Sequence, residues 1–354
     1  MSVSVVIPCL NEEETIEACV REAREAFPSE SDEIIVVDNG STDRSFELAK
    51  AAGAKVIQER RRGYGSAILR GFQEAQADIL IMGDADLSYD FHDAKRLVEK
   101  LREEDADFAI GSRLRGKIEK GAMPWLHQKF GTPLLTGFLN LIFGTRLSDI
   151  NCGLRAFKKS CLEKMNLRSP GMEFASEMVI HAQKAGLKFV EAPIKLRKRG
   201  GGVAKLRTFR DGWRHLRFIL YCAPFSLFVL PALLGLAVSA WCFWSPRFGY
   251  QVMGSFVLIS SFQVLSFGLM AKTFLWVSDS FLVDRGFARF IESFRLEYGI
   301  LGSLGVFGAG VLVLQGVDLR SLILGFALVA LGIQIFFSSF FVSILLSKAS
   351  REST

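Results

Sequence analysis

Two aspartates separated by a single residue stand where a strand-like segment ends. Asp84 and Asp86 lie in the run Gly83–Ser88, directly after the apolar segment Ile79–Met82. Carboxylates at positions i and i+2 after a strand can converge on one hard divalent cation, whose other ligands would be phosphate oxygens. Such a cation would neutralise the charge that grows on a departing diphosphate. The triplet alone is weak evidence, because solvated surface loops often contain acidic residues.

Two further turns strengthen this interpretation. The acidic turn Asp38–Asp43 also follows an apolar segment, and Arg62–Ala67 places two glycines ahead of a helical pattern. Glycines let the backbone approach a ligand, and a helix N-terminus favours an anion, although an ordinary turn has the same pattern. No G-x-G-x-x-G run follows the first apolar segment, which argues against a dinucleotide-binding fingerprint.

Short apolar segments alternate with helical patterns through the first part of the chain. Strands are expected at Val3–Ile7, Ile34–Val37, Lys55–Ile57, Ile79–Met82 and Phe108–Ile110. Helices are expected at Glu13–Phe27, Asp43–Ala52 (capped by Ser41 or Thr42 and ended by Gly53), Ser66–Ala77 and Asp93–Arg102. This order predicts an α/β domain with a mostly parallel sheet and helices on both faces. Ligands of such sheets bind beyond the carboxyl ends of the strands, where Asp38 and Asp84 fall.

The pattern loosens after residue 115 but continues to alternate. Helical patterns cover Leu126–Phe143 and Glu173–Ala185, and strand patterns cover Gly153–Phe157 and Lys188–Ile194. The six cysteines show no paired spacing and the four histidines no metal-ligand spacing, so we expect buried free thiols and structural histidines.

The last third of the chain is strongly hydrophobic. Charge-free stretches at about 218–244, 248–271, 298–317 and 321–347 each supply about the 20 apolar residues that a membrane-spanning helix needs. Their lack of Asp, Glu, Lys and Arg argues against a transporter, whose ion pathways use such groups.

Two amphipathic segments flank these stretches. One apolar stripe falls within 205–217 (Leu206, Phe209, Trp213, Leu216) and another within 285–297 (Phe287, Phe290, Ile291, Phe294). Both fit helices in the membrane interface, or surface helices packed on the domain. Nine Lys or Arg against one acid between Lys195 and Arg217 favour a membrane surface over a nucleic acid as the partner.

The distribution of basic residues predicts a topology. Arg285, Arg289 and Arg295 lie between the second and third stretches, and Lys348 and Arg351 follow the fourth, whereas the other two loops carry only Arg247 and Arg320. The apolar run Val3–Leu10 is too short for a signal peptide. Both termini, the tail 348–354 included, are therefore expected in the cytosol of a multi-pass protein of the cell membrane or an endomembrane.

Several motifs occur in a fixed order along the chain. They are Val5–Glu12, Asp38–Asp43, Arg62–Ala67, Asp84–Asp86, Gly111–Arg113, Ser148–Phe157, Glu173–Met178 and Arg199 with Lys205-Leu206. As an ordered set they resemble the family-2 glycosyltransferases of the GT-A fold, and more narrowly the dolichyl-phosphate mannose and glucose synthases, which are polyprenyl-phosphate hexosyltransferases. The resemblance covers about residues 3–217. It implies a cytosolic GT-A domain at 1–204. The hydrophobic pattern adds an interfacial helix at 205–217 and four membrane helices within 218–347.

The resemblance also implies roles for matching residues. The nucleotide sugar would be bound by Pro8, Asn11, Glu12, Asp38, Arg62, Gly63, Asp84, Ala85, Asp86 and Arg113. The metal, Mg²⁺ or Mn²⁺, would be held by Asp84, Asp86 and Ser88. The acceptor phosphate would be gripped by Arg113, Arg155, Arg199 and Lys205. Asp84, Asp86, Arg199 and Lys205 would carry the catalysis, although Arg199 and Lys205 could instead serve only to set the membrane topology.

The reaction implied is the inverting transfer of one hexose from a nucleotide sugar to polyprenyl or dolichyl phosphate on the cytosolic face. UDP-glucose is the preferred donor and GDP-mannose the alternative, because the mannose synthases carry Leu-Gln after the Asp-Ala-Asp triplet and this chain has Leu87-Ser88. Processive polysaccharide synthases share the fold, but their Q-x-x-R-W motif is missing from this sequence. A transporter or a non-catalytic membrane scaffold is the alternative from another class, and a homo-oligomer is left open.

Overall fold

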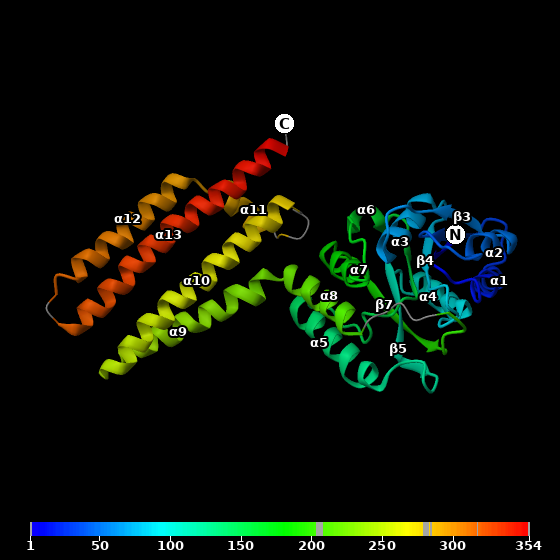
Figure 1. The fold of residues 1–354 in the computed structure, drawn as a ribbon, viewed down its shortest axis with the longest axis horizontal. Coiled ribbons are helices and arrows are strands. Elements are labelled where there is room, and N and C mark those ends of the chain that lie inside the picture. The colour runs from blue at the N-terminus through cyan, green and yellow to red at the C-terminus, as the bar shows by residue number, and fades with distance from the viewer. Residues whose placement is uncertain (1, 203–207, 279–282, 284, 317, 353–354) are drawn as a thin grey trace. The chain divides into compact units, whose positions relative to one another are not determined.

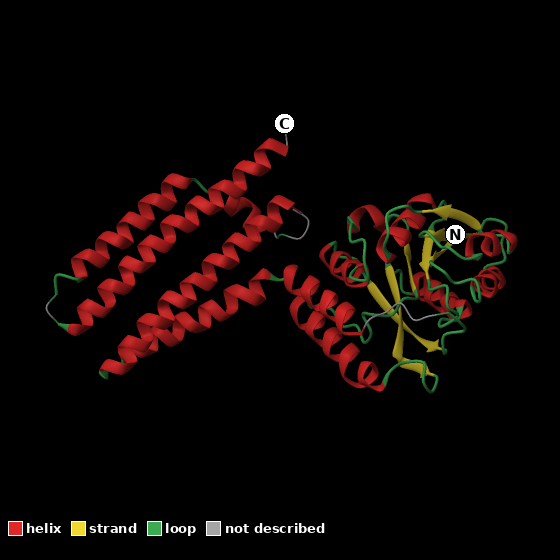
Figure 2. Cartoon of the chain, viewed as in Figure 1, coloured by secondary structure: helices red, strands yellow, loops and turns green. Residues whose placement is uncertain are grey.

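The protein is described by a computed structural model that covers residues 2–202, 208–278, 283, 285–316 and 318–352. The chain divides into two compact units, Met1–Ile219 and Leu220–Thr354. Figure 2 shows strands and helices together in the first unit and helices in the second. The segment 205–217, expected to stand apart from the domain, falls within the first unit by this division.

The first unit is built on one seven-stranded sheet in the order β3-β2-β1-β4-β6-β5-β7. Its strands are β1 (Val3–Cys9), β2 (Glu33–Asp38), β3 (Lys55–Gln58), β4 (Ile79–Met82), β5 (Phe108–Ile118), β6 (Arg155–Lys158) and β7 (Phe189–Leu196). All pairings are parallel except those of β6, which runs antiparallel to both β4 and β5. The predicted mostly parallel sheet is confirmed.

Helices lie on either side of this sheet (Figure 1). They are α1 (Ile16–Ala26), α2 (Ser45–Ala51), α3 (Tyr64–Glu74), α4 (Phe91–Glu103), α5 (Thr132–Phe143, preceded by a π-helical turn at His127–Gly131), α6 (Cys161–Met165), α7 (Phe174–Lys184) and α8 (Thr208–Tyr221). The predicted cap of α2 is wrong, since the helix begins after Arg44 without a side-chain cap. The Ser41 hydroxyl instead accepts a hydrogen bond from the Asn11 amide, 2.9 Å away.

The strand directions bring distant loops to one edge of the sheet. β1, β2, β4, β5 and β7 run in the same direction, so their carboxyl ends meet there, while the antiparallel β6 contributes its amino end. Residues after β1, β2, β4 and β7, together with those before β6, therefore share one region, as the alternating sequence pattern predicted for Asp38 and Asp84.

Close packing between α3 and the sheet depends on a glycine. A Cβ atom at Gly71 would lie 2.3 Å from Val6 Cγ1 and 3.0 Å from Val37 Cγ2, which no real packing allows. Val6, Val37 and Phe72 are fully buried around this contact. Gly71 thus sets how near α3 lies to β1 and β2, and with it the position of the turn that begins the helix.

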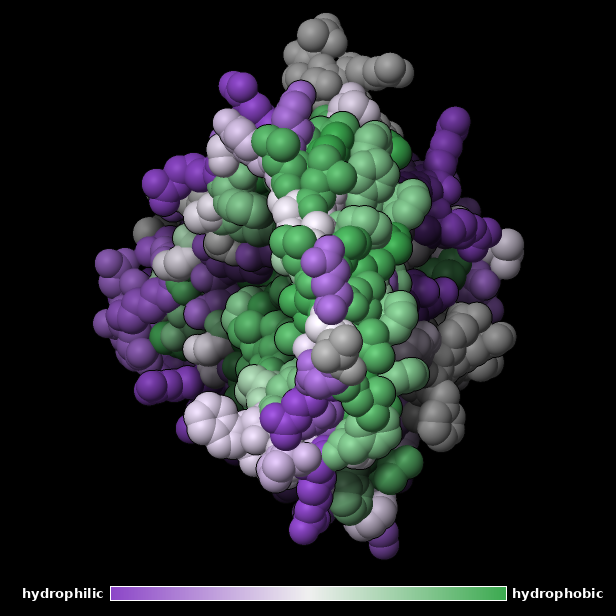
Figure 3. Space-filling model, turned by 90° about the vertical axis from the view of Figure 1, so that its left-hand side faces the viewer, coloured by the Kyte–Doolittle hydropathy of each residue, from purple (hydrophilic) through white to green (hydrophobic). Residues whose placement is uncertain are grey.

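The second unit consists of long apolar helices. They are α9 (Leu230–Trp244), which follows a π-helical turn at Phe225–Val229, α10 (Phe248–Ser278), α11 (Arg285–Glu292), α12 (Leu296–Val313) and α13 (Leu319–Glu352). Within the described residues, four segments are long and apolar enough to cross a membrane, at Phe225–Trp244, Phe248–Ser278, Leu296–Val313 and Leu319–Ser347. Hydrophobic side chains form a broad band over the face of the molecule seen in Figure 3, and exposed residues such as Leu234, Trp244 and Phe256 belong to this unit.

The spanning helices of the structure differ at their ends from the predicted membrane segments. The stretch expected at 218–244 is interrupted after Tyr221, and the spanning helix starts at Phe225. Pro224 lies at this break, where a proline disfavours helical geometry in the residue before it. The other three spans each include a charged residue, Lys272, Glu297 and Arg320, because α10, α12 and α13 extend beyond the charge-free stretches. All six cysteines are buried, as predicted.

Replacing Gly71 by Ala should destabilise the first unit. Overpacking of this kind costs about 1–3 kcal/mol, or roughly 3–9 °C in the unfolding midpoint of the full chain in detergent. Gly137→Ala on α5 is the matched control, because a Cβ there meets nothing within 4 Å. The control should be neutral or slightly stabilising, as alanine is the better helix former. Equal midpoints for the two variants would contradict the packing argument.

Candidate active site

The loop after β4 is fixed by contacts with α1 and α3. The Tyr64 hydroxyl donates to Asp84 Oδ1 at 2.9 Å, and the Thr15 hydroxyl donates to the Ala85 carbonyl at 2.7 Å. Gly153 lies on the other side, where a Cβ atom would approach Asp84 Oδ2 to 2.9 Å. Asp84 is thereby held between the start of α3 and the segment that leads into β6.

Asp86 closes a tight turn in the same loop. Its Oδ1 accepts hydrogen bonds from the Ser88 amide at 3.0 Å and from the Ser88 hydroxyl at 2.5 Å. Leu87, between them, has φ 61°, a left-handed conformation that is rare for a leucine. Backbone strain of this kind persists only where the surroundings enforce it. The Ser88 hydroxyl therefore orients Asp86 here, and its role as a metal ligand stays a prediction.

Arg199 joins two of the strand-end loops. Its Nη1 donates to Asp86 Oδ2 at 2.8 Å, and its Nη2 donates to both carboxylate oxygens of Glu12 at 2.5 Å. The side chain of Glu12 is 7% exposed and that of Asp86 is 16% exposed, so water screens these ion pairs only in part. One guanidinium thus connects the loops that follow β1, β4 and β7.

The site carries more negative charge than these contacts neutralise. Burial, followed by the neighbouring carboxylate of Asp86, raises the pKa of Asp84 to about 7 against the lowering effects of Tyr64, Arg113 and Arg199. Such a carboxylate favours a nearby positive charge. Asp84 and Asp86 offer the hard oxygen donors that Mg²⁺ and Mn²⁺ prefer, so the residues present fit the predicted metal.

The turn after β2 is tied to the glycine-rich turn before α3. Asp38 is buried, and its carboxylate accepts the amides of Gly40 at 3.3 Å and Ser41 at 3.1 Å. The Gly63 amide donates to Asn39 Oδ1 at 2.7 Å. A Cβ at Gly40 would lie 3.2 Å from the Arg62 guanidinium carbon, so this guanidinium lies directly over the turn.

The residues after β1 are ordered by the same turn. Pro8 pairs with Val37 inside the sheet, and Asn11 has φ 50°. Asn11 Oδ1 accepts the Thr42 amide at 2.8 Å, and the Glu12 amide donates to the Ser45 hydroxyl at 2.8 Å. Pro8, Asn11, Glu12, Asp38, Arg62 and Gly63 are therefore brought to one side of the Asp84–Asp86 loop.

Arg113 lies at the carboxyl end of the regular part of β5, where the strand register with β7 becomes irregular. Its Nε donates to Asp149 Oδ2 at 2.6 Å and its Nη2 to Asp149 Oδ1 at 2.8 Å. Its charge lowers the pKa of Asp84, which burial raises. Arg113 is thus anchored near the loop, with its orientation set by Asp149.

Arg155 does not take the predicted position in the site. Its side chain is fully buried, and its three nitrogens donate to the carbonyls of Cys152, Ala175 and Ile150 at 2.8–2.9 Å. The predicted phosphate contact of Arg155 is contradicted, because this guanidinium stabilises the backbone behind the site. Lys205 falls outside the described residues.

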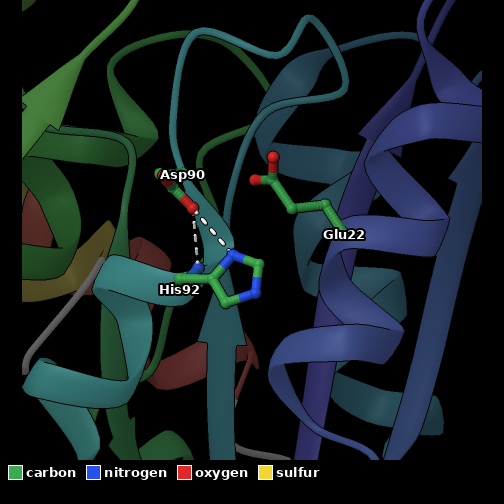
Figure 4. Close-up of side chains that lie close together, drawn as sticks. All are labelled: Glu22, Asp90 and His92. Atoms are coloured by element: carbon green, nitrogen blue, oxygen red, sulfur yellow. Dashed lines mark hydrogen bonds and ion pairs between the residues drawn. The ribbon is translucent and has the colours of Figure 1, made fainter.

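A second acidic group lies beside the site. Glu22 on α1, with Asp90 and His92 at the start of α4, could bring three ligand atoms within reach of one cation (Figure 4). Arg197 Nη1 donates to Glu22 at 2.7 Å, and its Nη2 pairs with Asp90. Burial would raise the pKa of Asp90, but the His92 amide and Arg197 hold it below its usual value. Arg197 supplies the positive charge here, so this cluster is a structural junction.

Sequence reasoning missed several residues that hold the site together. Asn39 and Tyr64 lie within turns that the sequence analysis identified, but neither residue was assigned a role in the site. Glu177 is buried, and its carboxylate accepts the amides of Arg168 and Ser169, which holds the adjoining Pro170 carbonyl against Gly63. The signal that could have identified Glu177 is its place directly before the apolar run Met178–Ile180, where a buried carboxylate needs partners.

Substituting Arg155 by Lys should lower stability, because a lysine cannot donate to three separated carbonyls. Buried carbonyls left unpaired cost about 1–3 kcal/mol each, so we expect the midpoint of thermal unfolding to fall by roughly 5–10 °C. Arg115→Lys is the control, since Arg115 is 62% exposed. A midpoint for Arg155→Lys equal to that of the control would argue that Arg155 is not a structural residue.

Comparison with known proteins agrees with this architecture. The family model for glycosyl transferase family 2 matches residues 4–165. The low-salt glycan biosynthesis hexosyltransferase Agl6 of Haloferax volcanii is 41% identical over 281 residues, which span 75% of this chain and 67% of the relative. A dolichol-phosphate mannosyltransferase of Pyrococcus furiosus is 30% identical over 226 residues, which span 61% of this chain and 63% of the relative.

Solved structures share the fold. Glucosyl-3-phosphoglycerate synthase of Mycobacterium tuberculosis, crystallised with Mn²⁺, UDP and glucosyl-3-phosphoglycerate, matches with a TM-score of 0.51 at 23% identity, over 62% of this chain and 78% of that one. The same enzyme has also been crystallised with Mg²⁺ and UDP. The GT-A fold expected from the sequence is thereby confirmed. By its matched domain and its hexosyltransferase relative, the chain belongs to glycosyl transferase family 2 and is a glycosyltransferase.

Proposed function

We propose that this enzyme transfers a single hexose from a nucleotide sugar to a polyprenyl or dolichyl phosphate, with inversion at the anomeric carbon. The observation that carries the proposal is the pairing of Asp86 with Arg199 at the strand ends, next to Asp84, whose pKa the charge of Arg199 lowers. The described part of the same chain contains four helices that could span a membrane. A soluble catalytic unit joined to such helices suits an acceptor that the membrane holds.

The nucleotide sugar would bind along the loops after β1, β2 and β4. We assign the nucleoside to Pro8, Asn11, Glu12, Asp38, Arg62 and Gly63, and the diphosphate to Asp84, Ala85, Asp86 and Arg113. The M. tuberculosis structures, which contain UDP with Mn²⁺ or Mg²⁺, support a nucleotide diphosphate and a divalent metal at this edge of the sheet. The bound metal would supply positive charge to the departing diphosphate. Asp86 would hold it directly, with Asp84 and Ser88 sharing in its ligation.

Arg199 has a specific part in this proposal. Its guanidinium neutralises Asp86 and Glu12. A bound cation would give these carboxylates another positive partner, and the guanidinium would then be able to pair with phosphate oxygens. Arg199 is thus placed to pair either with the carboxylates or with an anionic substrate.

The acceptor phosphate needs different help from a sugar hydroxyl. It is already anionic at neutral pH, so it requires alignment and relief from repulsion by the donor diphosphate more than a general base. Arg113, Arg199 and Lys205 are assigned to this task. We place the active site on the cytosolic face, with both termini on that side, because the basic loops of the sequence favour this orientation.

The identity of the transferred sugar is supported by fewer observations than the type of reaction. UDP-glucose is our preferred donor, and the departure at Ser88 from the Leu-Gln of mannose synthases supports it. The Pyrococcus relative, a dolichol-phosphate mannosyltransferase, supports GDP-mannose as the second candidate.

Purified enzyme given a panel of UDP- and GDP-sugars with undecaprenyl phosphate should form one lipid product that carries one hexose. UDP-glucose should give the highest rate and GDP-mannose the next. Mass spectrometry of the extracted lipid measures the product. A polymer of many sugars, or no glycolipid with any donor, would overturn the proposal.

Asp86→Asn should lower the rate of transfer by about a hundredfold or more, because it removes the charge that holds the metal while it preserves the shape of the side chain. Asp105→Asn is the control, since Asp105 is 94% exposed on the surface and pairs only with Lys158 among the residues described. The control should retain full activity. Transfer that survives both EDTA and Asp86→Asn would exclude a metal role for Asp86.

A further inference from the structure

Three buried polar atoms beside the site have no hydrogen-bond partner among the described residues. They are Ser66 Oγ, Asn151 Oδ1 and Glu173 Oε2. A buried polar atom without a partner costs about 1–3 kcal/mol, and native proteins contain few of them. Their occurrence in one region suggests that a ligand supplies the missing partners.

All three belong to segments that surround Asp84. Ser66 is on the first turn of α3, two residues after Tyr64, which donates to Asp84. Asn151 precedes Gly153, whose Cα faces Asp84 Oδ2. Glu173 is adjacent to Phe174, and a Cβ at Gly65 would lie 2.8 Å from Phe174 Cβ.

Arg155 holds two of these segments together. Its Nη1 donates to the Ala175 carbonyl at 2.8 Å and its Nη2 to the Ile150 carbonyl at 2.8 Å. The backbone near Glu173 and the backbone next to Asn151 are thereby attached to the same guanidinium. The Ser66 amide donates to the Pro170 carbonyl at 3.2 Å, which links the third segment to the loop that leads to Glu173.

The position of the Glu173 carboxylate is built into the backbone. It folds back over Gly171, where a Cβ atom would lie 2.5 Å from Oε2 and 2.8 Å from Oε1. Only glycine at residue 171 leaves room for this arrangement. The loop itself is anchored by Glu177, which accepts the amide of Ser169 at 2.9 Å. The Glu173 carboxylate therefore lies directly over Gly171, and its Oε2 has no hydrogen-bond partner among the described residues.

The chemistry of these atoms identifies the kind of ligand. A carboxylate oxygen and an amide oxygen only accept hydrogen bonds, so they need a ligand that donates hydrogen bonds and would repel a phosphate. A sugar next to a bound diphosphate presents several hydroxyl groups. We propose that Glu173 and Asn151 accept hydrogen bonds from hydroxyls of the transferred hexose, with Ser66 as a third contact, and so determine which hexose is used. This inference rests on the proposed function, because it assumes a nucleotide sugar at the strand ends.

Glu173→Gln tests the proposal, with Glu163→Gln, an exposed residue on α6, as the matched control. A hydrogen bond to a charged group contributes about 1.5–3 kcal/mol, so kcat/KM for the preferred donor should fall about 10- to 150-fold. The affinity for the free nucleoside diphosphate with Mn²⁺, measured by calorimetry, should change less than about twofold on the same reasoning, since the carboxylate contacts only the hexose. Gly171→Ala, which displaces the carboxylate, should reproduce the loss.

Deoxy analogues of the preferred donor sharpen the test. The analogue that lacks the hydroxyl bound by Glu173 should react equally with wild type and Glu173→Gln, whereas the other analogues should retain the difference. Unchanged kcat/KM in Glu173→Gln, an equal loss of nucleoside diphosphate affinity, or sensitivity of every analogue would overturn the inference. A wild-type enzyme that binds nucleotide sugars but does not glycosylate polyprenyl phosphate would refute the proposed acceptor, while the calorimetric comparison of nucleotide sugar with diphosphate would still decide the role of Glu173.

Discussion

The structure depends on the concentration of negative charge at the carboxyl ends of β1 and β4. Parallel strands bring Glu12 and Asp86 to the same edge of the sheet, and Arg199 from beyond β7 pairs with both. Each carboxylate is mostly shielded from water. Removing one partner from such a set would leave a poorly solvated charge, which is costly. The three loops are therefore stable in these positions only together.

The segment that carries Arg199 is itself held in place. The Gly200 amide donates to the Asp86 carbonyl at 2.9 Å, and the Arg197 amide donates to the Ser88 carbonyl at 2.8 Å. The Arg197 side chain adds ion pairs to α1 and α4 through Glu22 and Asp90. The strained backbone at Leu87 is enclosed by these contacts, since a Cβ at Gly200 would lie 2.8 Å from Leu87 Cδ1. A site organised in this way needs little rearrangement when a charged substrate arrives.

Much of the fold could be predicted from periodicity. The bounds of β4 coincide with the predicted segment Ile79–Met82, and the carboxyl-edge placement of Asp38 and Asp84 follows from a parallel sheet alone. The end of β5 was harder to predict. The strand continues to Ile118 through Arg113 and Arg115, and these charged residues interrupt the apolar pattern that indicates a strand. The extension is stabilised by pairing with β7, which lies more than 70 residues further along the chain. The sequence near β5 therefore does not indicate this pairing.

The candidate site, like the fold, could be predicted only where local sequence determines it. Motif position identifies which residues gather at the strand ends, but it does not show what each side chain contacts. Arg155 and Arg113 both stand in recognised motifs, yet one is buried among carbonyls and the other is oriented by Asp149. The unpartnered oxygens of Asn151 and Glu173 depend on packing between distant segments, which single-sequence patterns do not contain.

The most direct test of the central claim measures metal binding at the strand-end carboxylates. Electron paramagnetic resonance of Mn²⁺, titrated with the full chain and either UDP or GDP, reports how much of the ion remains free. The account predicts one bound Mn²⁺ per chain in the presence of a nucleoside diphosphate, and loss of that binding when Asp84 and Asp86 are both replaced by Asn. Equal Mn²⁺ binding by the doubly substituted protein, or no binding with either nucleotide, would contradict it.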